Sequence, residues 1–256
     1  MSEVKEIKKV PVVLAQLRTK KPLLDRTEKP KKVSLNRKAI EFVTITKKVE
    51  LFHDQDNNTY VTFSNKNKKA VTCSIDDDNF AKWVGHEFYQ AFSADDNNVL
   101  SETNMKTCLG MLKAIASEEG ECCEVYQRVG MNNGNIYIDL ANDAYENIEI
   151  STNGWKINNN YSMKFKRNSN MRALPTPTSG GNIDDLLDYT NIPADKWKIV
   201  LAWIIQNYLL GSAFPILSFS GLQGTAKSTT QECIKMLIDP SANNLTTAPK
   251  KAEDLF

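Results

Sequence analysis

The sequence contains few of the residues that build metal sites and disulfide frameworks. Its 256 residues include only two histidines, His53 and His86, and neither has a cysteine or carboxylate at the spacing of a zinc site. Five cysteines are present, none in a C-x-x-C pair: Cys73, Cys108, Cys122, Cys123 and Cys233. A zinc site and a disulfide framework are therefore not expected, and these residues are typical of reduced thiols in a cytoplasmic protein.

Uninterrupted apolar runs are also missing. The amino terminus is charged and has no continuous apolar core before Pro22, so the pattern of a signal peptide is absent. Residues 199–219 come nearest to a membrane span, but four residues interrupt them: Gln206, Asn207, Gly211 and Pro215. We expect a buried helix followed by a buried strand in this stretch, and no association with a membrane.

What is present is the composition of a globular protein, with 41% hydrophobic and 25% charged residues. The formal net charge of +1 hides an asymmetry, because residues 1–48 contain 14 Lys/Arg against 5 Asp/Glu. We interpret this segment as a flexible basic arm that contacts DNA phosphates, or alternatively as a solvated linker. The candidate DNA-contacting residues are Lys20, Lys21, Lys31 and Lys32 in the arm, with Lys166 and Arg167 later in the chain.

Hydrophobic periodicity after the arm predicts an α+β domain over residues 49–168. Strands are expected at 50–53, 59–63, 126–129, 135–140, 148–150 and 155–157, with helices from about Asp77 and over 101–117. Residues 169–182 include a stretch rich in Pro, Thr and Gly, and we expect them to form a linker. Residues 183–256 are expected to supply helices at about 183–189 and 195–210, and then the first strand, loop and helix of a second domain.

The most informative motif is the glycine-rich loop 221–228, which reads GLQGTAKS. It matches the phosphate-binding pattern G-x-x-x-x-G-K-[ST], except that Ala226 replaces the glycine before the lysine. In that pattern backbone N–H groups hold the phosphates, Lys227 reaches the β and γ oxygens, and Ser228 ligates Mg²⁺. An apolar run at 214–220, typical of a buried strand, precedes the loop. Apolar residues at helical spacing follow it over 228–238, so that a helix N-terminus would face the bound phosphate. An ordinary Gly-rich turn is the alternative.

The loop therefore predicts a site for ATP and Mg²⁺. The candidate binding residues are Gly221, Gly224, Thr225, Ala226, Lys227, Ser228 and Thr229, with Ser228 as the candidate metal ligand.

Several further motifs occur in a fixed order along the chain. They are residues 134–140, Gly154-Trp155, residues 165–167, Leu174-Pro175, Gly180-Gly181, residues 214–217 leading into the loop, and Asp239-Pro240. In this order they resemble the primase-helicase-type ATPases of phages and integrated mobile elements, over about residues 49–256. The resemblance implies an AAA+ or superfamily 3-like motor of DNA replication, usually a homo-hexamer. The implied fold is an α+β amino-terminal domain followed by the start of an α/β P-loop NTPase domain.

Several parts of such a motor have no counterpart in this sequence. In the proteins that the chain resembles, an acidic Mg²⁺-binding strand, a polar sensor and an arginine finger follow the segment that here ends at Phe256. We therefore expect the chain to be the amino-terminal part of a helicase. Alone, it should hydrolyse little or no ATP. The alternative is a non-enzymatic DNA-binding or interaction protein that retains a nucleotide loop.

Overall fold

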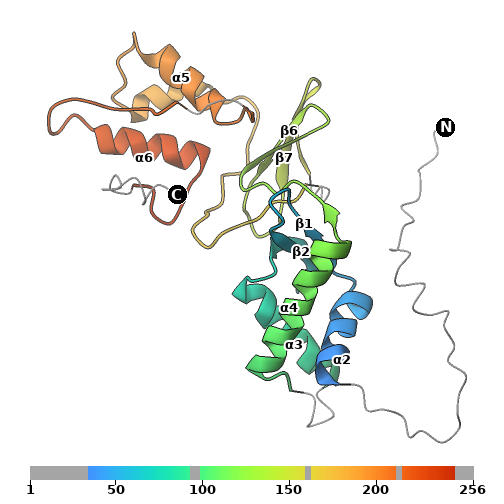
Figure 1. Ribbon diagram of the computed structural model, residues 1–256. Helices are drawn as coiled ribbons and strands as arrows, with labels where there is room; N and C mark the ends of the chain where they lie inside the picture. Colours follow the sequence, from blue (N-terminus) through green and yellow to red (C-terminus); the bar gives the residue numbers. More distant parts are fainter. Residues whose placement is uncertain (1–33, 93–98, 159–162, 212–214, 246–256) are drawn as a thin grey trace, which may run out of the picture. The chain divides into compact units, whose positions relative to one another are not determined.

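The computed structural model describes residues 34–92, 99–158, 163–211 and 215–245 (Figure 1). The four candidate lysines of the basic arm lie outside these ranges, as do Phe214 and residues 246–256. The described part has α+β architecture, with one mixed sheet, one antiparallel sheet and helices.

The first sheet has the strand order β3-β2-β1-β4. Its strands are β1 (Glu50–His53), β2 (Thr59–Ser64), β3 (Ala70–Ser74) and β4 (Glu121–Cys122). β4 runs parallel to β1, and the other neighbours are antiparallel. The Asp54 carboxylate accepts hydrogen bonds from the backbone N–H groups of Asp56 and Asn58, at 3.0 and 2.8 Å. These bonds fix the turn of the predicted β1–β2 hairpin, which is confirmed.

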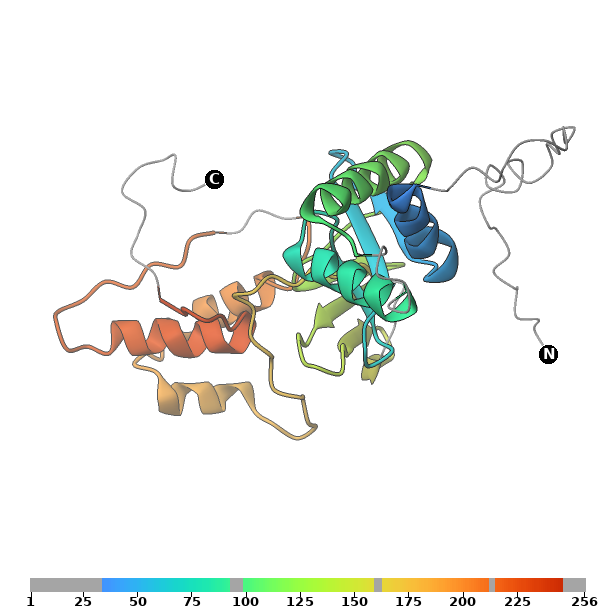
Figure 2. The ribbon, with the colours of Figure 1, turned by 90° about the horizontal axis from the view of Figure 1, so that it is seen from below.

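Helices pack against one face of the first sheet (Figures 1 and 2). They are α2 (Leu35–Glu41), the π-helical turn η1 (Phe42–Thr46), α3 (Asp78–Phe92) and α4 (Glu102–Glu119). Both predicted helices of this region are confirmed, and Ser101 caps α4 by accepting a hydrogen bond from the N–H of Asn104 at 3.2 Å. The core between helices and sheet is apolar and includes Val61, Phe63, Phe80, Val84, Phe88 and Leu112.

Helix and core residues are already present from Leu35 onwards, before the boundary at residue 49 that the sequence predicted. Ala39 and Val43 are completely buried, and Phe42 packs edge to face against Phe88 with ring centroids 5.7 Å apart. The prediction failed because the high positive charge of residues 1–48 obscured a short apolar face. Residues 35–43 therefore contribute to the core, and the arm that the sequence predicted does not include them.

The second sheet is antiparallel, with the order β5-β6-β7-β8. Its strands are β5 (Val129–Asn132), β6 (Asn135–Asp139), β7 (Asn147–Ser151) and β8 (Gly154–Asn158). Asn133 and Gly134 connect β5 to β6, both with positive φ, 50° and 76°. This is the backbone that an Asn-Gly hairpin turn requires, and both predicted hairpins are confirmed. β5 begins three residues later than the strand expected at 126–129.

The regular elements described after β8 are all helical. They are the 3-10 helix η2 (Ile183–Tyr189), α5 (Trp197–Gln206) and α6 (Lys227–Ile238). α5 and α6 share an apolar cluster that includes Trp197, Val200, Ile204, Ile234 and Ile238. The segment expected as a linker also packs, because Leu174 is buried and its N–H donates to the carbonyl of Leu140 at 2.9 Å. No helix of the described residues is long and apolar enough to cross a membrane.

The strand expected at 214–220 does not form over its described part, residues 215–220. A strand requires a hydrogen-bonding neighbour, and no described residue pairs with the backbone of Ile216–Ser220. The alternation of a strand nevertheless persists, since Leu217 and Phe219 pack against the α5–α6 cluster while Ile216 is 94% exposed. The sequence identified the alternating apolar pattern correctly. Among the described residues, however, no neighbouring strand pairs with residues 216–220.

Candidate phosphate-binding site

The loop 221–228 combines positive φ angles with a direct entry into α6. Gly224 has φ +83° and Ala226, immediately before the helix, has φ +55° and ψ +24°. A β-carbon at Gly221 would approach the hydroxyl of Thr225 to 3.1 Å, so this position also favours glycine. The backbone therefore doubles back on itself between Gly221 and the first residue of the helix.

The ammonium group of Lys227 lies inside this loop. Its Nζ donates to the carbonyl oxygens of Gly221 and Leu222, at 3.0 and 2.6 Å, and to the hydroxyl of Thr225 at 3.2 Å. The Thr225 hydroxyl in turn donates to the carbonyl of Leu222 at 2.9 Å. The acceptors that the described residues offer to this cation are all neutral, and an anionic phosphate oxygen would be a stronger partner for it.

The first turn of α6 adds polar groups next to the ammonium. Ser228 and Thr229 are exposed there, and the helix N-terminus carries a partial positive charge. Ser228 can supply one hydroxyl ligand to a Mg²⁺ ion, which retains several waters and also binds phosphate oxygens. The described residues contain no group of three or more His, Cys, Asp or Glu that could hold a metal. The loop therefore suits Mg²⁺ only together with a phosphate.

Asn191 is a loop contact that sequence reasoning did not find. Its side-chain Nδ2 donates to the carbonyl of Thr225 at 3.3 Å, and its backbone N–H donates to the hydroxyl of Thr230 at 3.3 Å. Thr230 is almost completely buried in α6. Asn191 ties the segment after η2 to the loop and the helix, and nothing in local sequence spacing connects residues so far apart.

The opposite end of α6 is held by a buried arginine. Arg128 donates through Nε to Oδ1 of Asp239 at 2.9 Å, and through its other nitrogens to the carbonyls of Asp139 and Arg172, both at 3.0 Å. Burial alone would raise the pKa of Asp239. The hydrogen bonds and charges of Lys235 and Arg128 outweigh burial and hold the pKa of Asp239 below its ordinary value. α6 is therefore anchored by an ion pair at the end away from the loop.

The cationic residues after β8 are engaged in contacts within the protein. Arg167 donates to both oxygens of Asp139, at 2.8 and 2.6 Å, and to the carbonyl of Asn142 at 2.6 Å. Lys164 is buried and pairs with Glu50 at 2.5 Å. Lys166 lies over the ring of Tyr60, with its Nζ 5.6 Å from the centroid. Lys166 and Arg167 are the candidate DNA-contacting residues among those described. The guanidinium of Arg167 is paired with an internal carboxylate.

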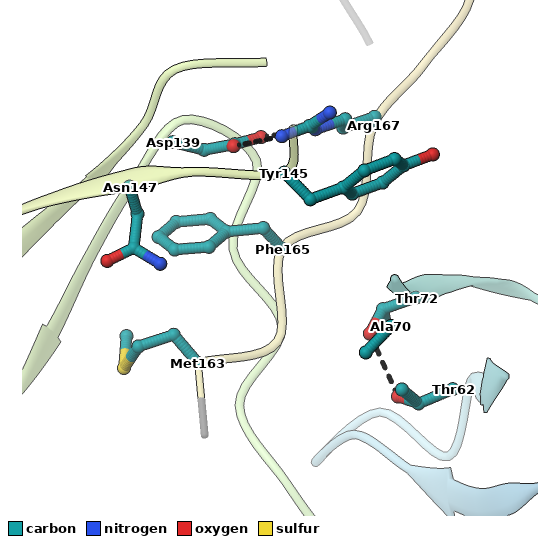
Figure 3. A pocket seen from close by; sticks show the side chains of 9 residues that line it. All are labelled: Thr62, Ala70, Thr72, Asp139, Tyr145, Asn147, Met163, Phe165 and Arg167. Atoms are coloured by element: carbon teal, nitrogen blue, oxygen red, sulfur yellow. Dashed lines mark hydrogen bonds and ion pairs between the residues drawn. The ribbon is translucent and has the colours of Figure 1, made fainter. Parts of the chain in front are cut away.

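Two hollows of the described residues can be excluded as the phosphate site. One is a cavity of about 30 Å³ between the two sheets, lined on one side by Thr62 and Thr72 and on the other by the Asp139–Arg167 pair (Figure 3). It holds about one water and no nucleotide. The other, about 670 Å³, is bordered by Asp56 and Glu124, whose charge opposes phosphate. The loop is the better candidate.

Comparison of the chain with protein-family models, with curated proteins and with solved structures finds no match.

Ala226 adopts a conformation that favours glycine, and this leads to a prediction about the loop. A left-handed conformation costs a non-glycine residue about 1–2 kcal/mol, partly offset by the greater freedom of glycine in the unfolded chain. Ala226→Gly should therefore stabilise the start of α6 by up to about 1 kcal/mol. Amide hydrogen exchange in α6 should slow by up to about fivefold.

Ala114→Gly is the matched control for Ala226→Gly. Ala114 is exposed within α4, where glycine should destabilise the helix by about 1 kcal/mol and speed its exchange. If Ala226→Gly also sped exchange in α6, the left-handed conformation at residue 226 would be refuted.

Proposed function

We propose that residues 221–229 bind the triphosphate of ATP with Mg²⁺. The observation that supports this most is the placement of the Lys227 ammonium inside a loop of carbonyl and hydroxyl acceptors at the start of a helix. An ammonium group held beside helix N–H groups is the arrangement that recognises β and γ phosphates. Binding of a fluorescent ATP analogue that unlabelled ATP displaces, and that requires Mg²⁺, tests this proposal.

We further propose that the chain is the ATP-binding part of a DNA replication helicase of the primase-helicase type. This step rests on the motif order from residue 134 to Pro240 and on the charge of residues 1–48. In such a protein ATP binding would be coupled to DNA, and the active form would be a homo-hexamer. The fold proposed for residues 183–256 is the beginning of an α/β P-loop domain.

Turnover of ATP by this chain alone should be close to the uncatalysed rate. Among the described residues no Asp or Glu forms a hydrogen bond or ion pair with residues 221–228. Phosphoryl transfer needs acidic Mg²⁺ ligands, a group that orients water and cationic neutralisation, and an arginine finger alone contributes about 10³–10⁵ in rate. Phosphate release should be measured with and without single-stranded DNA. DNA-stimulated release that disappears in Lys227→Ala would contradict this expectation.

Within residues 34–92, 99–158, 163–211 and 215–245 no carboxylate contacts the loop, and this also favours a second candidate function. In this alternative the chain binds nucleotide without turning it over and acts as a DNA-binding or interaction protein. The two functions differ in whether a second polypeptide that carries the acidic strand, the sensor and the arginine finger restores DNA-stimulated hydrolysis, since a motor depends on all of these groups together.

DNA binding should be sequence-independent and should depend on residues 1–33. Each duplex phosphate neutralised by Lys or Arg contributes a slope of about −0.9 to the logarithmic dependence of affinity on salt. Removal of residues 1–33 should therefore weaken binding and flatten the slope. The deletion stops before Leu35 because α2 belongs to the core.

A substitution in the folded part provides the control for this deletion. Lys66 and Lys68 are exposed at the β2–β3 turn, and Lys66→Gln with Lys68→Gln should change the slope little. If the turn variant lost affinity while the truncated chain bound DNA normally, the site would lie on the folded domain.

A further inference from the structure

The segment that follows η2 lies along the first two turns of α6. Asn191 donates from its side chain to the carbonyl of Thr225 in the loop, and from its backbone N–H to the hydroxyl of Thr230. Two residues earlier, the carbonyl of Tyr189 accepts a hydrogen bond from the thiol of Cys233 at 3.8 Å. Cys233 is in the second turn of α6, about 9 Å along the helix axis from its first residue. The backbone of Tyr189 is therefore held beside α6, one step away from the loop.

The side chain of Tyr189 remains in solvent although its backbone is held. The ring is 72% exposed, the largest value for any aromatic side chain among the described residues. Its ring and hydroxyl form no hydrogen bond or ring contact with the rest of the described chain. A tyrosine offers a large apolar surface that is normally buried at least in part. Tyr189 thus presents an unused aromatic surface next to the candidate phosphate site.

Contacts on both sides fix the backbone that carries this ring. Within η2, the carboxylate of Asp184 accepts a hydrogen bond from the indole of Trp197 in α5 at 2.7 Å. Immediately after the ring, the hydroxyl of Thr190 donates to the carbonyl of Leu186 at 2.9 Å, and Asn191 is joined to α6. An aromatic side chain on a fixed backbone has few rotatable bonds to immobilise, so it loses little entropy when it packs on a ligand.

The charges around the ring suit a neutral base and not a phosphate. Asp188 precedes Tyr189 and Glu232 precedes Cys233 in the sequence, and both of these acidic residues are exposed. Carboxylates repel phosphate oxygens, whereas the ammonium of Lys227 and the N-terminus of α6 attract them at the loop. The two ends of this stretch of α6 therefore favour the two different ends of a nucleotide.

We propose that Tyr189 stacks on the base of the nucleotide whose phosphates the loop binds. The contact presupposes the function proposed for residues 221–229. In a nucleoside triphosphate the α-phosphate and the ribose separate the base from the β and γ phosphates, and the hydrogen bond at Cys233 places Tyr189 a comparable step away from Lys227. Stacking uses the face of the ring and needs no hydrogen bond from the phenol. Tyr189 is thus a binding residue that recognises the base and takes no part in phosphoryl transfer.

Calorimetric titration with ATP and with inorganic tripolyphosphate, each in the presence of Mg²⁺, tests the proposal. Tripolyphosphate has the same chain of phosphates and no base. Tyr189→Ala should weaken the binding of ATP by about fivefold or more, the effect of losing one base–aromatic contact, and should leave the binding of tripolyphosphate unchanged. Tyr189→Phe keeps the ring and should bind both ligands like the wild type.

Tyr89→Ala is the matched control, because Tyr89 is also an exposed tyrosine but belongs to α3, which packs with the first sheet. It should bind ATP like the wild type, and circular dichroism checks the fold of every variant. Equal affinity of Tyr189→Ala and wild type for ATP, or an equal loss for both ligands, would overturn the stacking contact and leave the role of the loop standing. A wild type that bound neither ligand would refute the proposed function, and the stacking contact with it.

Discussion

Lys227→Ala should weaken the binding of an ATP analogue by about tenfold or more. The substitution removes a charge-assisted contact with phosphate, which contributes on the order of 1.5–3 kcal/mol. The ammonium group is already placed in the loop by the carbonyls of Gly221 and Leu222, so little reorganisation is needed for it to meet a phosphate. Titration of a fluorescent analogue in the presence of Mg²⁺ measures the effect.

Two further variants separate this effect from a loss of loop structure. Thr225→Val keeps the ammonium and removes only the hydroxyl that contacts it at 3.2 Å, so its loss of affinity should be smaller. Lys82→Ala removes an exposed lysine of α3 and should bind like the wild type. Equal affinity of Lys227→Ala and wild type would show that residues 221–228 are an ordinary Gly-rich turn.

Asp139→Ala should destabilise the protein by about 3–5 kcal/mol, the cost typical of breaking a buried ion pair. Asp139 is 2% exposed, and Arg167 and the N–H of Ala141 donate to its carboxylate. Removal of the carboxylate leaves the guanidinium of Arg167 without a counter-charge in a partly buried site. Urea denaturation, followed by far-ultraviolet circular dichroism, measures the change in the free energy of unfolding.

A double substitution tests the reason for that loss. Asp139→Ala with Arg167→Met removes both charges, so it should be less destabilising than Asp139→Ala alone. Lys106→Ala deletes an exposed pair with Glu102 on α4 and should change stability by no more than about 0.5 kcal/mol. If the double variant were the less stable one, the Asp139–Arg167 pair would not be the source of the effect.

Local patterns in the sequence predicted most of the regular elements. Asn133-Gly134 specifies a hairpin because both residues readily adopt positive φ, and the apolar spacing from Phe80 to Phe88 specifies α3. The loop and the start of α6 were located for the same reason, since glycine positions and helical spacing are properties of adjacent residues. Ala226 was identified as the departure from the phosphate-binding pattern, and its φ of +55° explains why glycine is favoured there.

Long-range contacts decided what these patterns could not. The short apolar stretch of α2 became part of the core because α3, α4 and the first sheet supply partners for Ala39 and Val43. Residues 215–220 have the alternation of a strand and yet no paired backbone among the described residues, since pairing depends on a neighbour and not on local sequence.

The sequence by itself therefore determined the hairpins, the helices from α3 onwards and the phosphate-binding pattern around Lys227, because each depends on residues close together in the chain. Only the tertiary structure decided that Arg167 pairs with Asp139, that Arg128 holds the end of α6, and that Asn191 reaches the loop. These contacts join residues far apart in sequence, and burial determines which charged groups must be paired inside the protein and which remain available to a ligand.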